Sequence, residues 1–263
     1  MLKAVTTEHL IRAHLPDHHS PEQIESRYRS LITNPRFFQF ANIPRRIIQC
    51  LDSFSIRADN ERVHAALLAY YIFIGVTDDT IDGGDEDAGE NILARLTTPF
   101  VSLNDITVSS DAEFMSELLK LHFPASHSSH IRSKFRTIHK INLRERRARN
   151  MRAFVKMREL LGSVTADISY LLIQEHVEED ARQLRRLMKR VGAVGCLVDS
   201  AIDLRNDQRA GLIGFRPALT EWVYLYVRTF WLGIRTVAKY PRLVRLFFEA
   251  IADNAHDRRR SFT

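Results

Sequence analysis

Two short clusters of aspartates carry the chemistry that this sequence suggests. The first comprises Asp78, Asp79 and Asp82, which come directly after an apolar run over residues 65–76. In a helix, Asp78 and Asp82 lie one turn apart on the same face. Carboxylates this close repel one another and hold their charge only if a cation joins them. Oxygen ligands without Cys or His favour a hard ion, so we expect Mg²⁺, with Mn²⁺ able to replace it.

The second cluster repeats this arrangement near residue 200. A small, apolar run over residues 192–198 leads into Asp199, Asp203 and Asp207, which are again spaced by four. At that spacing the three carboxylates form one stripe across two turns of a helix. A single acidic run is equally well explained as a frayed surface loop. Two such runs, each at the foot of an apolar helix, favour facing walls of one metal site.

The rest of the sequence predicts helices that carry these clusters. Ser20-Pro21 starts a helix that Asn34-Pro35 ends, and Asp59 opens the long helix that Gly83-Gly84 closes. The other predicted helices cover residues 90–96, 111–122, parts of the proline-free stretch 131–176, 178–207, 218–238 and 242–253, with a loop at 97–110. Apolar–polar alternation typical of strands occurs only briefly, at 106–109. We therefore predict an all-α protein, a single-domain helical bundle over residues 1–263, with 1–20 and 257–263 expected to be flexible.

Composition favours an ordinary globular protein. The chain has 263 residues, 45% of them hydrophobic and 27% charged, with a net charge of +6. The small basic excess does not require a nucleic-acid partner. Both cysteines, Cys50 and Cys196, lie in apolar surroundings, which fits a reducing compartment. The first residues lack a signal-peptide core, and the longest apolar run is shorter than the ~20 residues that span a bilayer. We expect a cytoplasmic protein with peripheral membrane contact.

The two acidic motifs resemble those of the squalene/phytoene synthase group of class I isoprenoid synthases. The first motif of that group, Asp-x-x-x-Asp with a following Gly, is matched by residues 78–83. Its second motif, another Asp-x-x-x-Asp with a basic residue and a Gly shortly after, is matched by residues 203–211. Gly192 stands where the group has a helix-packing glycine, and residues 34–41 and 161–164 are similar to its N-terminal and central segments. The resemblance covers roughly residues 34–216.

The resemblance implies the class I isoprenoid (terpenoid) synthase fold and Mg²⁺-dependent ionisation of an allylic isoprenyl diphosphate. In this interpretation Asp78, Asp82, Asp203 and Asp207 are the catalytic metal ligands, and Asp79 and Asp199 are supplementary ligands. Arginine can hold phosphate oxygens in bidentate fashion, and aromatic faces can stabilise a carbocation. The residues expected to bind substrate in these ways are Arg36, Arg205, Arg209, Tyr71 and Phe38.

Five positions depart from the group's pattern. Gly75 and Ile202 replace arginines close to the two motifs, Cys196 and Asp199 replace amide residues, and Lys156 replaces a tyrosine of the central helix. These changes affect contacts with diphosphate and with a second substrate. We therefore predict a terpene synthase acting on one substrate, with head-to-head condensation of two prenyl diphosphates as the alternative. The Asn-Asp-x-x-Ser-x-x-x-Glu motif of microbial terpene cyclases is not matched, because Ala210 and Gly214 replace its Ser and Glu.

Other classes of protein explain the acidic motifs less well. A calcium-binding EF-hand would need an apolar residue and a Glu where Asp85 and Gly89 stand. The basic run at 144–152 contains Glu145 and few aromatic residues, so we interpret it as a solvated helix face and not as a nucleic-acid site. A non-catalytic helical scaffold for anionic ligands or a membrane surface would not need acids on two apolar helices. A homodimer remains compatible with the sequence.

Overall fold

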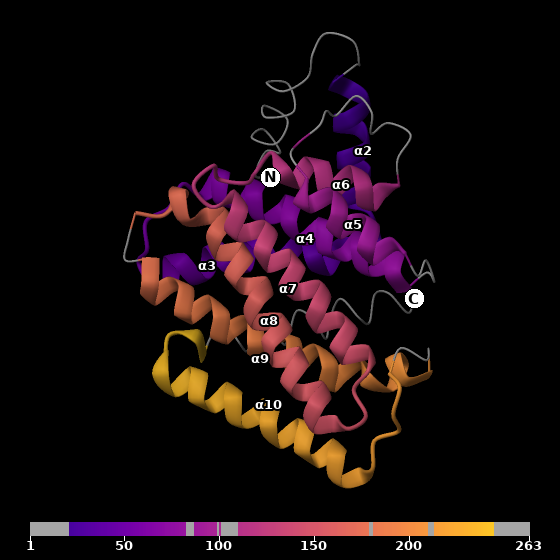
Figure 1. Ribbon diagram of the computed structural model, residues 1–263. Coiled ribbons are helices and arrows are strands. Elements are labelled where there is room, and N and C mark those ends of the chain that lie inside the picture. The colour runs from indigo at the N-terminus through magenta and orange to yellow at the C-terminus, as the bar shows by residue number, and fades with distance from the viewer. Residues whose placement is uncertain are drawn as a thin grey trace. The chain divides into compact units, whose positions relative to one another are not determined.

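The computed structural model describes residues 21–82, 87–98, 100, 110–178, 181–209 and 213–244. Helices make up 84% of these residues, and no strand occurs among them (Figure 1). An isolated bridge pairs Ala58 with Val177. The prediction of an all-α protein is thus confirmed for the described residues.

The predictions for residues 1–20, for the Gly83-Gly84 helix end, for Asp85, for 106–109 and for 245–263 lie outside them. Within the described helices, none is long and apolar enough to cross a membrane.

The contacts of the chain divide it into two compact units. The first unit comprises residues 1–129, 172–179 and 242–263, and the second comprises 130–171 and 180–241. The first acidic motif belongs to the first unit and the second motif to the second unit. The expectation of a single domain stays a prediction.

Helix α4 is the centre of the first unit. The unit contains α2 (Pro21–Thr33), the 3₁₀ helix η1 (Pro35–Phe37), α3 (Phe38–Ser53), α4 (Asn60–Asp82), α5 (Ala88–Thr97), α6 (Asp111–Lys120) and η3 (Gln174–His176). Helices α3, α5 and α6 all contact α4. Its residues Val63, Leu67, Tyr70 and Ile72 are fully buried, as expected for a helix that is apolar on every side. The predicted break at Asn34-Pro35 is confirmed. Helix α6 begins at Asp111, as predicted, and the Ser110 side chain before it accepts a capping hydrogen bond from the backbone N–H of Glu113.

Four long helices make up most of the second unit: α7 (Ser128–Arg146), α8 (Met151–Ile173), α9 (Ala181–Arg209) and α10 (Leu219–Lys239). The proline-free stretch is interrupted at residues 147–150, where the Asn150 side chain accepts a hydrogen bond from the backbone N–H of Ala153 at 2.9 Å. Figure 1 shows α9 and α10 side by side, and the two helices are in contact. Buried side chains of α8, α9 and α10 form one hydrophobic cluster, which includes Met151, Phe154, Val155, Leu197, Leu204 and Leu225.

Helices α8 and α9 approach each other closely at two glycines. A Cβ atom on Gly162 would lie 2.2 Å from the carbonyl oxygen of Gly192, and a Cβ on Gly192 would lie 2.4 Å from the carbonyl oxygen of Gly162. Side chains do not fit at such distances, so both positions require glycine for the helices to cross here. This contact fixes the place of α9, which carries the second acidic motif, against α8.

Asp167 is a buried carboxylate that ties three helices together. Its side chain is 1% exposed and contacts Lys134 Nζ of α7 at 2.8 Å and Arg185 Nη2 of α9 at 3.0 Å. Burial alone would raise the pKa of Asp167, but the hydrogen bonds and charges of Arg185 and Lys134 outweigh it and lower this pKa to about 2. The cluster therefore stabilises the second unit only while Asp167 is ionised.

We expect Asp167 to make the protein sensitive to acid. A carboxyl whose pKa falls from 3.8 to about 2 on folding contributes stability above pH 3.8, and this contribution is lost as the pH falls through 2. In Asp167→Asn the free energy of unfolding should drop by about 3–5 kcal/mol at pH 7, since two cations lose their partner. Its stability should also depend less on pH below 4. Urea unfolding at pH 7, 4 and 3 measures both effects. Equal pH profiles for variant and wild type would contradict this role.

Candidate functional site

The first acidic motif lies where α4 leaves the core. Val76 is buried, whereas Asp78 and Asp79 are exposed. Asp82 is the last described residue of α4, and its side chain lies outside the described part. Since α4 ends at Asp82, the three aspartates lie in its final turns. The apolar run is therefore core, as predicted, and the carboxylates of Asp78 and Asp79 reach solvent at its end.

The position of both motifs near helix C-termini is electrostatically unfavourable. Asp203 and Asp207 lie in the last two turns of α9, and residues 213–215 are already outside a helix. A helix C-terminus carries a partial negative charge, so a carboxylate in the last turn costs about 0.3–1 kcal/mol unless a cation compensates it. Exposed carboxylate oxygens at such ends fit a hard divalent cation.

Arg36 is the predicted phosphate-binding residue that the structure brings to the first motif. It lies in η1, where its backbone N–H donates to the Asn34 side chain. Its Nη1 atom is 3.3 Å from Oδ2 of Asp79, and the Arg36 side chain is 72% exposed. An exposed ion pair of this kind contributes about 0–1 kcal/mol. The guanidinium can therefore leave Asp79 for a phosphate at little cost.

Gly75 explains how η1 and α3 reach this position. A Cβ on Gly75 would lie 2.6 Å from the Phe40 ring and 3.1 Å from the Phe37 ring. Two aromatic rings thus occupy the space in which the resembling family carries an arginine. The departure at this position is a matter of packing, since an arginine here would displace Phe37 and Phe40.

The two predicted aromatic residues of the site differ in accessibility. Phe38 begins α3 and is 54% exposed, which makes it available to a ligand. Tyr71 is half-buried, and its ring centroid lies 5.3 Å from that of Tyr70, which is buried in the core. Tyr71 therefore reaches the surface of α4 seven residues, about two turns, before Asp78.

The second motif forms the predicted stripe along α9. Asp199 is exposed, and Asp203 and Asp207 are half-buried. Arg205 and Arg209, which we expect to bind phosphate, are exposed between and after them. The guanidinium of Arg205 lies 5.4 Å from the ring centroid of Trp222 in α10, so a cation–π contact orients it.

Arg158 of α8 contacts the first aspartate of this stripe, Asp199, and this contact was not predicted from the sequence. Its guanidinium donates to Oγ of Ser200 at 2.7 Å, to Asp199 Oδ2 at 3.3 Å and to Glu145 Oε1 at 3.4 Å. The Arg158 side chain is only 19% exposed. Arg158 lies one turn before Gly162, so the close crossing of α8 and α9 brings it to the motif.

The arginines of residues 144–152 are exposed, as predicted for a solvated face, and Glu145 is the exception among the charged residues of this run. Its side chain is only 17% exposed. Burial raises the pKa of Glu145 and the charge of Asp207 raises it further, while the charge and hydrogen bond of Arg158 lower it. A fourth carboxylate thus comes from α7 to the second motif. The position of Glu145 inside a run of arginines is the one sequence feature that could have indicated its role. The sequence does not reveal which side of the helix is buried.

Removing Arg158 should destabilise the protein, because Arg158 is the cation that pairs with the carboxylates next to this motif. We expect Arg158→Met to lower the free energy of unfolding by about 3 kcal/mol at pH 7, because Glu145 would be left buried without its cation. The pKa of Glu145 would rise further above its ordinary 4.5. An acid with a raised pKa loses stability as the pH rises above 4.5, so the variant should be closest to wild type in acid. Adding Glu145→Gln should restore part of the loss at pH 7. Additive effects of the two changes in urea unfolding would contradict the coupling.

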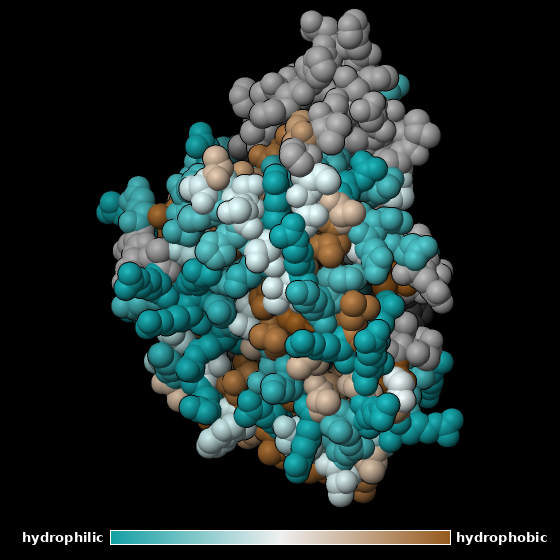
Figure 2. Space-filling model, viewed as in Figure 1, coloured by the Kyte–Doolittle hydropathy of each residue, from teal (hydrophilic) through white to brown (hydrophobic). Residues whose placement is uncertain are grey.

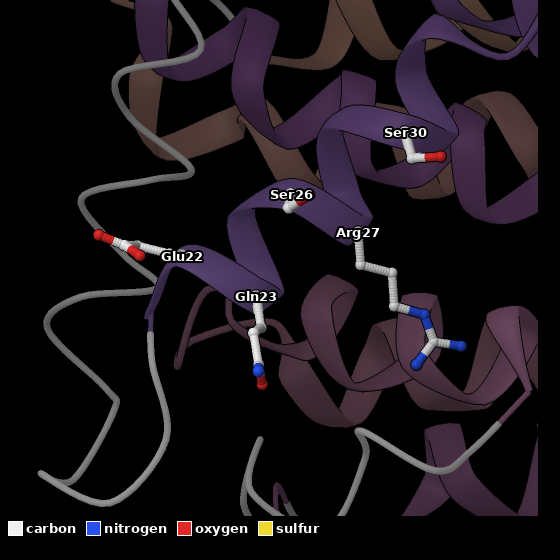
Figure 3. Close-up of a pocket in the computed structure, with 5 residues that line it drawn as sticks. All are labelled: Glu22, Gln23, Ser26, Arg27 and Ser30. Atoms are coloured by element: carbon white, nitrogen blue, oxygen red, sulfur yellow. The ribbon is translucent and has the colours of Figure 1, made fainter.

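The described residues do not by themselves complete a metal centre. Among the side chains that the structure describes, no group of three or more His, Cys, Asp or Glu residues is gathered around one point. The predicted centre needs Asp82, whose side chain lies outside this set, and ligands from both units. A shallow surface hollow along α2 is lined by Glu22, Gln23, Ser26, Arg27 and Ser30, whose side chains do not converge (Figure 3). None of these five is a predicted site residue, and Arg27 is held by Asp111 at 2.7 Å.

Comparisons with known proteins leave the motifs as the guide to function. No protein-family model matches the chain, and neither a curated protein nor a solved structure matches it.

Proposed function

We propose that this protein is a Mg²⁺-dependent enzyme of the class I isoprenoid synthase type, which ionises one allylic isoprenyl diphosphate and releases diphosphate. The specific synthase fold is part of this proposal. One observation supports it above the others: two helices each carry aspartates spaced by four in their final turns, α4 after a largely buried apolar run and α9 after a partly buried one. Carboxylates at this spacing repel one another, and a divalent cation bound between them relieves the repulsion.

Each motif combines aspartates that could bind Mg²⁺ with arginines that could bind the negatively charged diphosphate. In the first, Asp78, Asp79 and Asp82 would hold the metal, with Arg36 next to Asp79. In the second, Asp203 and Asp207 would do so, with Asp199 held by Arg158. When bound, Mg²⁺ would neutralise the leaving diphosphate. Arg36, Arg205 and Arg209 would bind phosphate oxygens, and their removal should weaken substrate binding.

The apolar part of the substrate needs a different environment. The carbocation left by diphosphate departure is destroyed by water, so the prenyl chain must be shielded while it reacts. Phe38 and Tyr71 lie on the two helices next to the first motif, and their rings can contact the prenyl chain or face the cation. An aromatic face contributes about 0.5–2 kcal/mol to a nearby cation.

Incubation with geranyl, farnesyl and geranylgeranyl diphosphates tests this function. We expect one of them to give a terpene hydrocarbon or alcohol with Mg²⁺ and none with EDTA, measured by gas chromatography–mass spectrometry. The product mass separates the two reactions, because condensation of two substrates doubles the carbon number. Absence of product and of released diphosphate from all three, with folding verified by circular dichroism, would overturn the proposal and favour a binding scaffold.

A further inference from the structure

Helix α10 presents a long apolar face that nothing in the described second unit covers. We call this the α10 face, and it consists of Leu219, Val223, Tyr226, Val227, Phe230, Trp231 and Ile234. Each of these side chains is at least 44% exposed, and Leu219 reaches 80% and Phe230 70%. Their spacing of four, three and one residues places them on one side of the helix. Figure 2 shows hydrophobic residues, in brown, at the surface among hydrophilic ones on the side it presents.

Within the α10 face, Tyr226 contacts the rest of the unit, through a hydrogen bond from its hydroxyl to the carbonyl oxygen of Ala201 in α9 at 3.4 Å. The opposite side of the helix attaches α10 to its unit, with Leu225 fully buried in the core cluster and Trp222, Tyr224 and Leu232 packed against it. On its flank, Arg228 Nη2 contacts Glu159 Oε2 of α8 at 2.9 Å. Thr236 is buried as well. The α10 face is therefore apolar surface in excess of what folding requires.

The α10 face is large for a surface that remains in water. Whole aromatic side chains have ~150–250 Å² of area, so seven large apolar residues at these exposures leave on the order of 700 Å² open. The largest apolar patch of an ordinary monomer is ~300–600 Å² and is often functional. We therefore expect the α10 face to have a binding partner.

Charge at the ends of the α10 face indicates which partner. From Leu219 to Ile234 no exposed residue is charged, whereas Arg216 before the face and Arg235 and Lys239 after it are exposed. The acid of the first turn, Glu221, accepts hydrogen bonds from the backbone N–H groups of Met151 and Ala218. The surface is thus an apolar centre with cations at both ends. Tyr and Trp within such a surface are typical of the membrane interface.

A second copy of the chain fits this charge pattern poorly. In an antiparallel two-fold contact between two α10 faces, Arg216 of one copy would lie near Arg235 and Lys239 of the other. A parallel contact would place each cation next to its own counterpart. Both arrangements bring like charges together, which disfavours association. An anionic lipid surface complements both ends at once.

We propose that the α10 face binds the surface of an anionic membrane, with α10 lying in the plane of the interface. The apolar side chains enter the boundary between headgroups and acyl chains, and Arg216, Arg235 and Lys239 contact lipid phosphates. Binding by this surface does not depend on the proposed catalytic function, because none of its residues belongs to the acidic motifs.

Flotation of the full chain with lipid vesicles tests this proposal. We expect binding to vesicles with 30% phosphatidylglycerol that weakens with salt, and much weaker binding to pure phosphatidylcholine. Phe230→Gln with Trp231→Gln should abolish binding to both. Arg235→Gln with Lys239→Gln should weaken binding to the anionic vesicles about 30-fold, since each cation near such a surface contributes about fivefold.

Matched controls come from α7 and α8. Arg136 and Lys140 are exposed at the same spacing as Arg235 and Lys239, and Leu143 and Leu160 are exposed apolar residues of other helices. Changing either control pair to Gln should leave vesicle binding unchanged. Equal losses in the controls, or no binding of the wild type to anionic vesicles, would overturn the proposal. So would a dimer in analytical ultracentrifugation that Phe230→Gln with Trp231→Gln converts to a monomer, because the α10 face would then bind a second copy.

Discussion

Asp78→Asn and Asp203→Asn are each expected to lower turnover of the isoprenyl diphosphate by roughly a thousandfold or more. Asparagine keeps the size of the side chain and one oxygen but removes the charge that holds a divalent cation. Loss of one charge-stabilising group in an active site typically costs 10²–10³-fold, and a lost metal ligand at least as much. The melting temperature should change little, because Asp78 is exposed and Asp203 is half-buried, and substitutions at such positions usually alter stability only slightly. Kinetics with farnesyl diphosphate and differential scanning calorimetry measure the two effects.

Asp52 provides the matched control for these variants. It is an exposed aspartate in the last turn of α3 and lies outside both motifs. Asp52→Asn removes the same charge from the same kind of helix end, so its effect on stability should be similar. Its activity should equal that of the wild type. A loss of activity in Asp52→Asn as large as in Asp78→Asn would show that charge alone, and not metal binding, is responsible.

Gly162→Ala and Gly192→Ala should destabilise the protein by about 2 kcal/mol or more each. The added methyl group would lie 2.2 or 2.4 Å from a backbone carbonyl oxygen, so α8 and α9 must separate. Overpacking of this kind costs about 1–3 kcal/mol and more where backbone must move. The gain in helix propensity from Gly to Ala is about 1 kcal/mol and does not offset it. The melting temperature should fall by about 4–8 °C.

Gly195 and Gly233 are the controls for this prediction. Nothing lies within 4 Å of a Cβ built on either residue, and Gly195 is in the same helix as Gly192. Gly195→Ala and Gly233→Ala should therefore raise stability by up to about 1 kcal/mol, through helix propensity alone. Opposite signs for Gly192→Ala and Gly195→Ala in urea unfolding would support the close crossing. Stabilisation by Gly192→Ala would contradict it.

The helices that carry the motifs could be predicted from the sequence because the signals are local. Asn34-Pro35 ends a helix through the missing N–H of proline, and the uninterrupted apolar run of α4 is typical of a helix buried on all sides. The acids at the end of α4 and along α9 follow from residue spacing. The helix-packing role of Gly192 was implied by the resemblance alone, and its partner Gly162 required the structure.

Contacts between distant residues could not be predicted in this way. Arg158 and Glu145 are 13 residues apart on different helices, and only the packing of the helices brings Arg158 to Asp199, Ser200 and Glu145. Burial of one glutamate within a basic run depends on how α7 is rotated about its axis. The exposed side of α10 is equally hidden in the sequence, because its apolar residues occur on both sides of the helix.

The most direct test of the account is the thermal stabilisation of the protein by Mg²⁺ and inorganic diphosphate, added together and separately. If both acidic motifs act on one metal–diphosphate group, the two ligands together should raise the melting temperature more than the sum of their separate effects. Asp78→Asn and Asp203→Asn should each lose this joint shift, and Asp52→Asn should keep it. Retention of the full joint shift in either motif variant would contradict the central claim that both motifs serve one site.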